Sequence, residues 1–232
     1  MKHGILPLII LLVIGCGSDS KGTSSTTLSS FTDSVSYSLG ADLGENLKTQ
    51  NVEINYDLIV AGLTDGMETG VVQLNPDERR KVMTALQKKI RDQAQLEGSN
   101  NLVVADEFLA KNKSENSEVK ETPTGLQYRV IQEGEGNSPI KSDNVKVHYV
   151  GRLMDGSEFD SSIKRGEPST FGLTQVIKGW TEGLQLMNVG SKFEFYIHPK
   201  LAYGPRPRPS IPGNSLLIFE VELLEIIEKL LY

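Results

Sequence analysis

The large apolar residues of this chain change their spacing, from a repeat of four residues near the start to a repeat of two near the end. The first spacing is carried by Phe31, Val35, Leu39, Leu43 and Leu47. Residues with this spacing lie on one face of a helix. After about residue 140, apolar and polar residues alternate, as they do along a strand with one buried face. The chain is therefore expected to have a helical part followed by a part built on a sheet.

Two more helices are predicted before the spacing changes. The first of them carries an apolar stripe made of Leu58, Ile59, Leu63 and Met67. The second opens with the letters "NPDERR", in which Asn75 can cap the helix, Pro76 suits its first position and Asp77 complements its dipole. Its apolar stripe continues through Val82, Leu86 and Ile90 towards Phe108 and Leu109.

Three amphipathic helices within residues 31–118 form a thin unit with little room for a core. A second copy of the chain would cover their apolar stripes, so we expect an all-α dimerisation region and a homodimer. The alternative is that the three helices pack on one another within one chain. The polar segment 111–125 is expected to be a linker, or the exposed end of the third helix followed by a linker.

Three half-buried strands are predicted in the second part, residues 119–232. The alternating apolar sets are Val145, Val147 and Tyr149; Phe193, Phe195 and Ile197; and Phe219, Val221 and Leu223. This alternation is typical of antiparallel strands with one face on a core. One short stretch, about 178–187, has a helical pattern between them. We therefore expect an α+β domain in which an antiparallel sheet wraps one short helix.

The start of the chain has the pattern of an export signal. An apolar run from Ile5 to Ile14 follows a basic start and is too short to span a bilayer of about 30 Å. The letters "VIGC" then resemble the bacterial lipobox, and Cys16 is the sole cysteine of the chain. We expect residues 1–15 to be a lipoprotein signal peptide and Cys16 to carry the lipid; a plain secretory signal with an incidental cysteine is the alternative. Residues 16–30, rich in Ser, Thr and Gly, would form a flexible tether.

A lipid on Cys16 would hold the protein on a membrane, because acylation at one cysteine commonly adds more than one chain and two chains anchor stably. We expect the bacterial cell envelope as the location, the outer membrane rather than the inner, with the protein facing the periplasm or the cell exterior. Acylation would also leave no thiol for a disulfide, a cysteine nucleophile or a thiolate metal site.

Conventional catalytic groups are scarce. The net charge of -6 argues against nucleic acid as a partner, since phosphate binding requires a dense basic face. His148 and His198 are not at metal-ligand spacing, and the chain has neither a nucleophile elbow nor a glycine-rich phosphate loop after a strand. We expect no metal and no cofactor, and if the second part is an enzyme, it works without a nucleophile as well.

Four segments of the second part occur together in a known family. They read "VKVHYVGRLMDGSEFDSS", "VIKGWTEGL", "LAYGP" and "SIPGNSLLIFEVELL", in this order. The region from about Gly125 to Ile227 resembles an FKBP-type peptidyl-prolyl cis-trans isomerase. With "SYSLGADLGENLK" and the lipobox, nearly the whole mature chain resembles the macrophage infectivity potentiator group of bacterial isomerases. The resemblance implies rotation about X-Pro bonds of proline-containing polypeptides, and competition by macrolide inhibitors such as rapamycin.

The resemblance also implies a pocket built from residues of all four segments. They are Tyr149, Phe159, Asp160, Val176, Ile177, Trp180, Tyr203, Ile211 and Phe219. The sole tryptophan, Trp180, is expected to be the pocket floor, with the Ile177 N–H and the Tyr203 hydroxyl holding a substrate carbonyl. Catalytic roles are expected for Asp160, Tyr203 and Tyr149. The sequence leaves open whether Asp160 orients the pocket wall or interacts with the twisted carbonyl.

An apolar pocket suits this reaction. Rotation about an X-Pro amide has a barrier of about 18–20 kcal/mol, because the resonance of the amide must be broken. The twisted amide has lost its charge separation, so a dry apolar pocket disfavours it less than it disfavours the planar ground state. No proton has to move.

Several of these residues also have an ordinary structural interpretation. Phe219 would be a core residue in any sheet, and Tyr149 would be a strand residue with its hydroxyl at the rim. Asp160 stands before two serines, an arrangement that is common in turns and caps. Trp180 suits the middle of a core as well as the floor of a pocket.

Two regions differ from the family pattern. Ser169 stands where the family often has an aromatic residue, although Phe171 is retained two places later, so the pocket is expected to be more open there. The loop "GPRPRPSIPG" is slightly shorter than in the family and carries Arg206 and Arg208. These arginines would favour acidic residues beside the substrate proline, or they simply belong to a solvated loop.

The sequence thus predicts a lipid-anchored, homodimeric prolyl isomerase that acts on exported proteins. The alternative function is an envelope chaperone or host-protein-binding module, whose pocket and helical arms hold unfolded or host proteins and whose isomerase activity is incidental.

Overall fold

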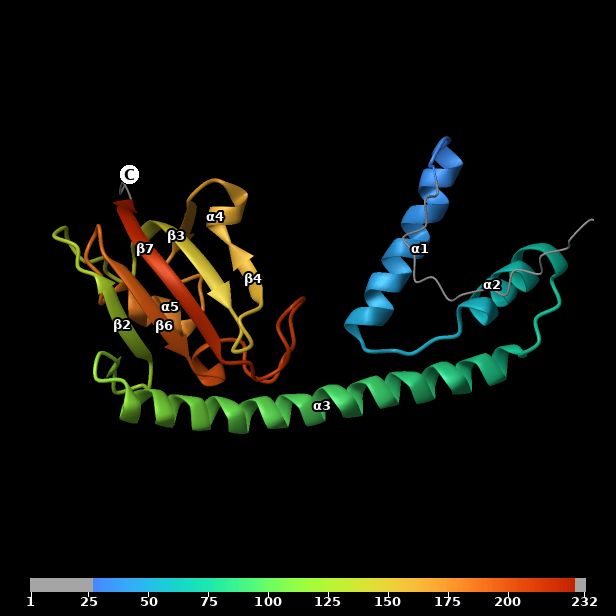
Figure 1. The fold of residues 1–232 in the computed structure, drawn as a ribbon, viewed down its shortest axis with the longest axis horizontal. Coiled ribbons are helices and arrows are strands. Elements are labelled where there is room, and N and C mark those ends of the chain that lie inside the picture. The colour runs from blue at the N-terminus through green and yellow to red at the C-terminus, as the bar shows by residue number, and fades with distance from the viewer. Residues whose placement is uncertain (1–26, 228–232) are drawn as a thin grey trace, which may run out of the picture. The chain divides into compact units, whose positions relative to one another are not determined.

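The structure is a computed structural model that describes residues 27–227. The predicted signal peptide, Cys16 and most of the predicted tether lie outside the described residues. The chain forms two compact units, Met1–Ile54 and Asn55–Tyr232, and their elements are drawn in Figure 1. The units divide inside the predicted helical region, residues 31–118, and the predicted domain boundary at residue 118 stays a prediction.

The first unit contains one described helix, α1 (Phe31–Thr49). The Ser30 hydroxyl caps it by accepting a hydrogen bond from the Asp33 N–H at 3.1 Å, and the Asp33 carboxylate accepts one from the Ser30 N–H at 2.8 Å. None of the residues of α1 is buried. The apolar stripe predicted from the sequence is therefore exposed, with Phe31 at 86% and Leu39 at 67% exposure.

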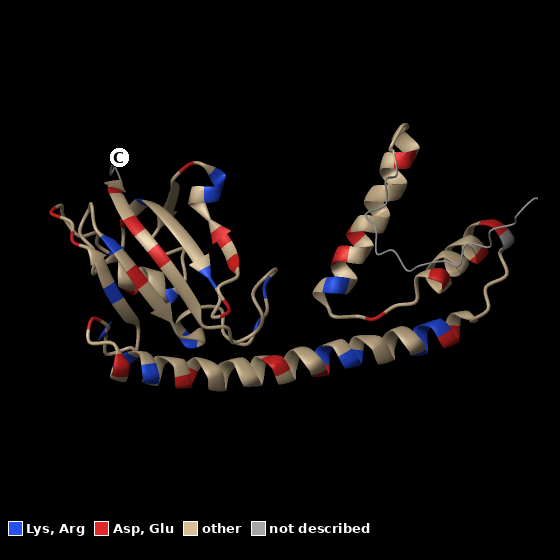
Figure 2. Ribbon diagram, in the orientation of Figure 1, with Lys and Arg blue, Asp and Glu red and all other residues tan. Residues whose placement is uncertain are grey.

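Two helices open the second unit. α2 (Tyr56–Thr64) leads into a short π-helix, η1 (Asp65–Thr69), and α3 (Pro76–Glu115) is continuous through Gly98. Asn75 caps α3 as predicted, because its side-chain oxygen accepts hydrogen bonds from the first N–H groups of the helix. Positive and negative side chains are interspersed along α3 (Figure 2). No helix in the described part of the chain combines the length and the apolar character that a membrane crossing requires.

The rest of the second unit is built on a seven-stranded antiparallel sheet. Its strands are β1 (Lys120–Glu121), β2 (Gln127–Gln132), β3 (Asn144–Arg152), β4 (Glu158–Ser161), β5 (Ser169–Gly172), β6 (Lys192–Ile197) and β7 (Leu217–Ile227). Their order is β1-β2-β6-β7-β3-β4, and β5 also pairs with β3. The three strands predicted from the alternation, β6, β7 and β3, are adjacent in the middle of the sheet. The predicted α+β class is confirmed.

One face of the sheet is covered by α5 (Lys178–Leu184), the helix predicted at this place. Two glycines one turn apart, Gly179 and Gly183, allow α5 to lie close to β6. A Cβ on Gly179 would be 2.6 Å from Ile197 Cγ2, and a Cβ on Gly183 would be 2.6 Å from Phe195 Cε1. Any larger residue would push α5 away from β6. Leu184 is completely buried in the resulting core.

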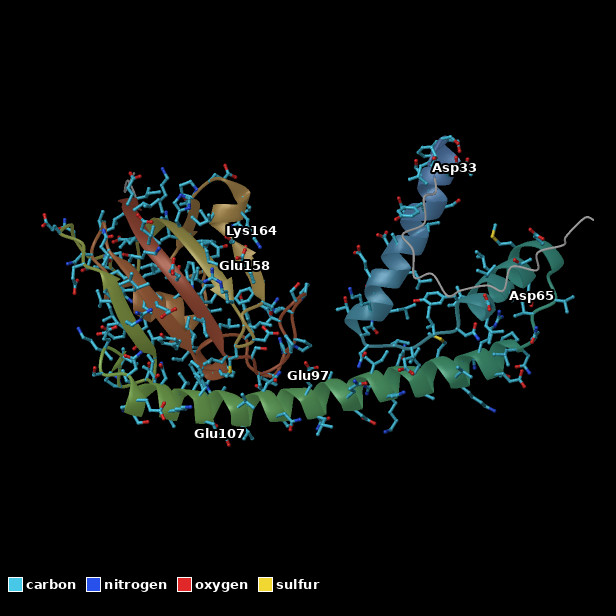
Figure 3. All side chains as sticks on the ribbon, viewed as in Figure 1. Asp33, Asp65, Glu97, Glu107, Glu158 and Lys164 are labelled. Carbon is cyan, nitrogen blue, oxygen red and sulfur yellow. The ribbon has the colours of Figure 1, made fainter. Side chains whose placement is uncertain are left out.

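The last turns of α3 pack against the opposite face at one end of the sheet, where they contact Tyr196 and Ile218. A second, smaller core consists of Ala105, Leu109, Tyr196 and Leu216. Side-chain amides add two links: Asn101 Nδ2 donates to the Gly213 carbonyl at 3.1 Å, and Asn214 Nδ2 donates to the Gly98 carbonyl at 3.0 Å. Glu107 projects from the side of α3 that faces away from the sheet (Figure 3). α3 therefore braces the loop that precedes β7.

Two short helices were not predicted. α4 (Ser162–Arg165) follows β4 directly, with Ser161 as its N-cap and Gly166 at its end in the left-handed region, φ 79°. A 3₁₀-helix, η2 (Pro199–Leu201), follows β6. Both are too short for a helical repeat to appear in the sequence.

Candidate active site

A cavity of about 420 Å³ lies where α5 meets the sheet. It is bounded by β3, β4, β5 and β7, by the segment that leads into α5, and by the loop between η2 and β7. Its lining consists of Tyr149, Phe159, Asp160, Phe171, Gln175, Val176, Ile177, Trp180, Tyr203, Arg208 and Phe219. The structure thus brings together every residue of the predicted site except Ile211.

The indole of Trp180 forms the centre of this lining. It is only 4% exposed. The rings of Tyr149, Phe171 and Phe219 meet it nearly at right angles, at interplanar angles of 88°, 88° and 78° and centroid distances of 5.1, 5.4 and 5.2 Å. These edge-to-face contacts are the favourable arrangement for aromatic pairs. Trp180 is therefore both a core residue and the floor of a box with aromatic walls.

The indole nitrogen has no hydrogen-bond partner, although it is buried. Among the described residues, Trp180 Nε1 is the sole buried side-chain nitrogen or oxygen of which this is true. A buried polar group without a partner is costly and rare in a purely structural core.

One wall of the cavity is held by a cluster of four polar side chains. The Tyr149 hydroxyl donates to Asp160 Oδ2 at 2.5 Å and accepts from Arg165 Nη2 at 2.9 Å. Arg165 Nη1 also donates to Asp160 Oδ1, and Nη2 donates to Ser169 Oγ at 3.0 Å. The short helix α4 places Arg165 here, because one helical turn after β4 folds the chain back towards Asp160.

The protonation states of this cluster are well defined. Burial acts to raise the pKa of Asp160, but the hydrogen bonds from Tyr149 and Arg165 outweigh it, and the pKa lies below its ordinary value. Burial, followed by the hydrogen bond to Asp160, raises the pKa of the Tyr149 phenol. At neutral pH the carboxylate is therefore charged, and the phenol keeps its proton.

The backbone of Tyr149 is fixed by a buried serine that the sequence analysis did not single out. Ser162 Oγ accepts a hydrogen bond from the Tyr149 N–H at 2.8 Å and donates to its carbonyl at 3.3 Å. Ser162 is completely buried. It thus ties the start of α4 to β3, next to the wall of the cavity.

Two donors at the cavity have no partner within the described residues. One is the N–H of Ile177, the residue before α5, whose carbonyl accepts from Trp180 and Thr181. The other is the hydroxyl of Tyr203, a residue that is 36% exposed. Both residues belong to the lining of the cavity.

Ile211 is the predicted site residue that is not among the lining residues of the cavity. It is 8% exposed and belongs to the main core, and its backbone pairs with that of Arg208. The lining also contains three residues that were not in the predicted site, namely Phe171, Gln175 and Arg208. In the described part of the chain, no cluster of three or more His, Cys, Asp or Glu residues could hold a metal ion.

Family models match both parts of the chain. Residues 136–224 match FKBP-type peptidyl-prolyl cis-trans isomerase, and residues 32–130 match the domain amino terminal to FKBP-type peptidyl-prolyl isomerase. The outer membrane protein MIP of Legionella longbeachae is 42% identical over 209 residues, which cover 88% of this chain and 89% of that protein. This chain belongs to the FKBP-type peptidyl-prolyl cis-trans isomerase family.

Another relative and a solved structure support the same family for this FKBP-type chain. The peptidyl-prolyl cis-trans isomerase Mip of Coxiella burnetii is 36% identical over 234 residues, covering 99% of this chain and 100% of that protein. The crystal structure of FkpA from Escherichia coli superposes with a TM-score of 0.61 and 36% identity, and the match covers 86% of this chain and 98% of that chain. The predicted family and the predicted isomerase are therefore confirmed.

Proposed function

We propose that the cavity lined by Trp180 is the active site, and that it accelerates rotation about X-Pro bonds by selecting a twisted amide. The observation that supports this most is the aromatic box around Trp180, whose floor and walls suit the flat, apolar ring of proline. An apolar box disfavours the twisted amide less than it disfavours the charge-separated planar form.

The polar groups at the rim would hold the substrate without reacting with it. The free N–H of Ile177 and the free hydroxyl of Tyr203 can donate to carbonyls on either side of the proline. The Asp160 carboxylate keeps the Tyr149 ring in place as one wall, through the 2.5 Å hydrogen bond. Asp160 therefore acts on the wall, while Ile177 and Tyr203 contact the substrate.

Removal of these groups should slow catalysis. We expect Asp160→Ala to lower kcat/KM about tenfold or more, because it leaves Tyr149 and Arg165 without their shared acceptor. Tyr203→Phe should lower it about twofold to tenfold, the effect of one hydrogen bond. A protease-coupled assay on a proline tetrapeptide measures both.

Asp155→Ala is the matched control for Asp160→Ala. It removes the same charge from the turn between β3 and β4, outside the lining of the cavity, and should leave the rate unchanged. Wild-type rates in both Asp160→Ala and Tyr203→Phe would contradict the proposed site.

We also propose that the protein is lipid-anchored in the bacterial envelope and acts on exported proteins. The support is the "VIGC" pattern that ends in Cys16 and the similarity to an outer membrane protein of Legionella longbeachae. The protein made in a bacterium should partition into the detergent phase, and the Cys16→Ser variant should stay in the aqueous phase. Aqueous partitioning of the wild type would contradict the anchor.

The N-terminal helices are proposed to pair with those of a second copy. In the single chain their apolar side chains are uncovered, for example Leu58 at 67% and Met67 at 78% exposure. The burial of such stripes is a common basis of homodimers. Light scattering of residues 24–232 should give twice the monomer mass, whereas a monomer mass would contradict the pairing.

The same exposed stripes favour a second candidate function, a chaperone that holds unfolded or host proteins. Suppression of aggregation of a proline-free client would support it, particularly if Asp160→Ala retains that effect. The two functions are compatible, because they use different surfaces of the chain.

A further inference from the structure

Arg208 lies at the mouth of the cavity and has no acidic partner. Its guanidinium stands over the ring of Tyr203, with Cζ 5.1 Å from the ring centroid, and it is part of the lining. No salt bridge within the described residues involves it. Its own loop, residues 202–216, contains no Asp or Glu.

The other charged residue in the lining, Asp160, is already paired with Arg165. Asp160 is the sole carboxylate in the lining, and its two oxygens accept hydrogen bonds from Tyr149 and Arg165. The lining residues thus leave one uncompensated charge at the mouth, the positive charge of Arg208.

The backbone that carries Arg208 is held in place. The Arg208 N–H donates to the Ile211 carbonyl at 2.8 Å, and the Ile211 N–H donates back at 3.0 Å. Between them stand Pro209, which fixes its own φ, and Ser210 at φ 64°, the sequence and geometry of a tight turn. The buried side chain of Ile211 anchors this turn in the core.

The base of the loop is held as well. The Asn214 N–H donates to the Gly204 carbonyl at 2.8 Å, and the side chains of Asn214 and Asn101 link this end to α3. Arg208 is thus presented at a nearly fixed place beside Tyr203. A preorganised charge loses less entropy on binding than one on a free loop.

We propose that Arg208 determines substrate specificity by favouring a carboxylate side chain, Asp or Glu, within one residue of the substrate proline. This inference rests on the proposed function of the cavity and names the class of substrate that it prefers. The interaction is that of an exposed ion pair, so it changes the choice among peptides and leaves the isomerisation mechanism unchanged.

The test uses pairs of peptides that differ only in Glu or Gln, placed directly before or directly after the proline. NMR exchange spectroscopy gives kcat/KM for each peptide with the wild-type protein and its variants. For at least one position, Arg208→Gln should lower the ratio of the Glu rate to the Gln rate about twofold to fivefold, the strength of an exposed ion pair. Arg208→Lys should keep most of the wild-type ratio.

Arg206→Gln is the matched control, because Arg206 belongs to the same loop and does not line the cavity. It should leave the ratio of the Glu rate to the Gln rate unchanged.

Added salt provides a second check. It should lower this ratio for the wild type and leave the ratio of Arg208→Gln unaffected, since exposed charges are screened over about 8 Å at physiological ionic strength.

Equal ratios in the wild type and Arg208→Gln at both positions would overturn the inference. An equal fall in Arg206→Gln would also overturn it, because the loop as a whole would then be responsible. Failure of the proposed function looks different: the wild type would not accelerate even the Gln peptides.

Discussion

Trp180→Leu should lower kcat/KM about tenfold to a hundredfold while the protein stays folded. The indole is the floor on which the proline ring would rest, and the loss of a buried contact of this size corresponds to about 1.5–3 kcal/mol. The variant should bind rapamycin more weakly for the same reason. The assay is accompanied by a thermal melt, which separates a lost pocket from a lost fold.

Leu184→Ala is the control for Trp180→Leu, because it should reduce stability without changing the rate of the folded protein. Leu184 is fully buried on the same helix, α5, but does not line the cavity. This variant should lose about 2–5 kcal/mol of stability, and its folded fraction should keep the wild-type rate. If Trp180→Leu instead unfolds the domain and the folded fraction is fully active, Trp180 is a core residue only.

Gly134→Ala should cause a large loss of stability. Gly134 lies between β2 and β3, and a Cβ there would be 2.4 Å from both the Ser191 nitrogen and the Val189 oxygen. These are backbone atoms, so no change of rotamer can relieve the clash. We expect a loss of roughly 3 kcal/mol, the upper end of overpacking costs, and a fall in Tm of about 6–12 °C.

Gly98→Ala is the matched control for this substitution. Gly98 is also buried, but its Cβ would meet the Gly213 oxygen at 3.5 Å, an ordinary contact, in the middle of α3. Alanine should therefore stabilise the helix by about 0.5–1 kcal/mol. A Tm of Gly134→Ala equal to that of the wild type would show that the turn around residues 188–191 can move.

The sequence predicted the elements that have a long, regular repeat. The alternation around Tyr149 and Phe219 located β3 and β7, because these strands bury one face over many residues. The strands β4 and β5, of four residues each, are too short to show such a pattern. The cap at Asn75 was also predicted correctly, because it depends on local chemistry alone.

The site was predicted through the resemblance rather than through spacing. Phe159 and Tyr203 come from distant parts of the chain, and no repeat in the sequence brings them to one cavity. Arg165 was missed, although a local signal exists: Ser161 can cap a helix and Gly166 can end it, which predicts one turn that returns Arg165 to Asp160. Ile211 was expected in the pocket through the resemblance. Its position could not be derived from spacing, because its backbone pairing with Arg208 depends on the shape of the loop.

The rate of cis-trans isomerisation of a proline tetrapeptide, with and without rapamycin, tests the central claim most directly. We expect the purified protein to accelerate the reaction, rapamycin to abolish the acceleration, and Asp160→Ala to retain only a small part of it. A rate equal to that of the uncatalysed reaction, or an acceleration that rapamycin at saturating concentration leaves untouched, would contradict the assignment of the Trp180 cavity as a prolyl isomerase site.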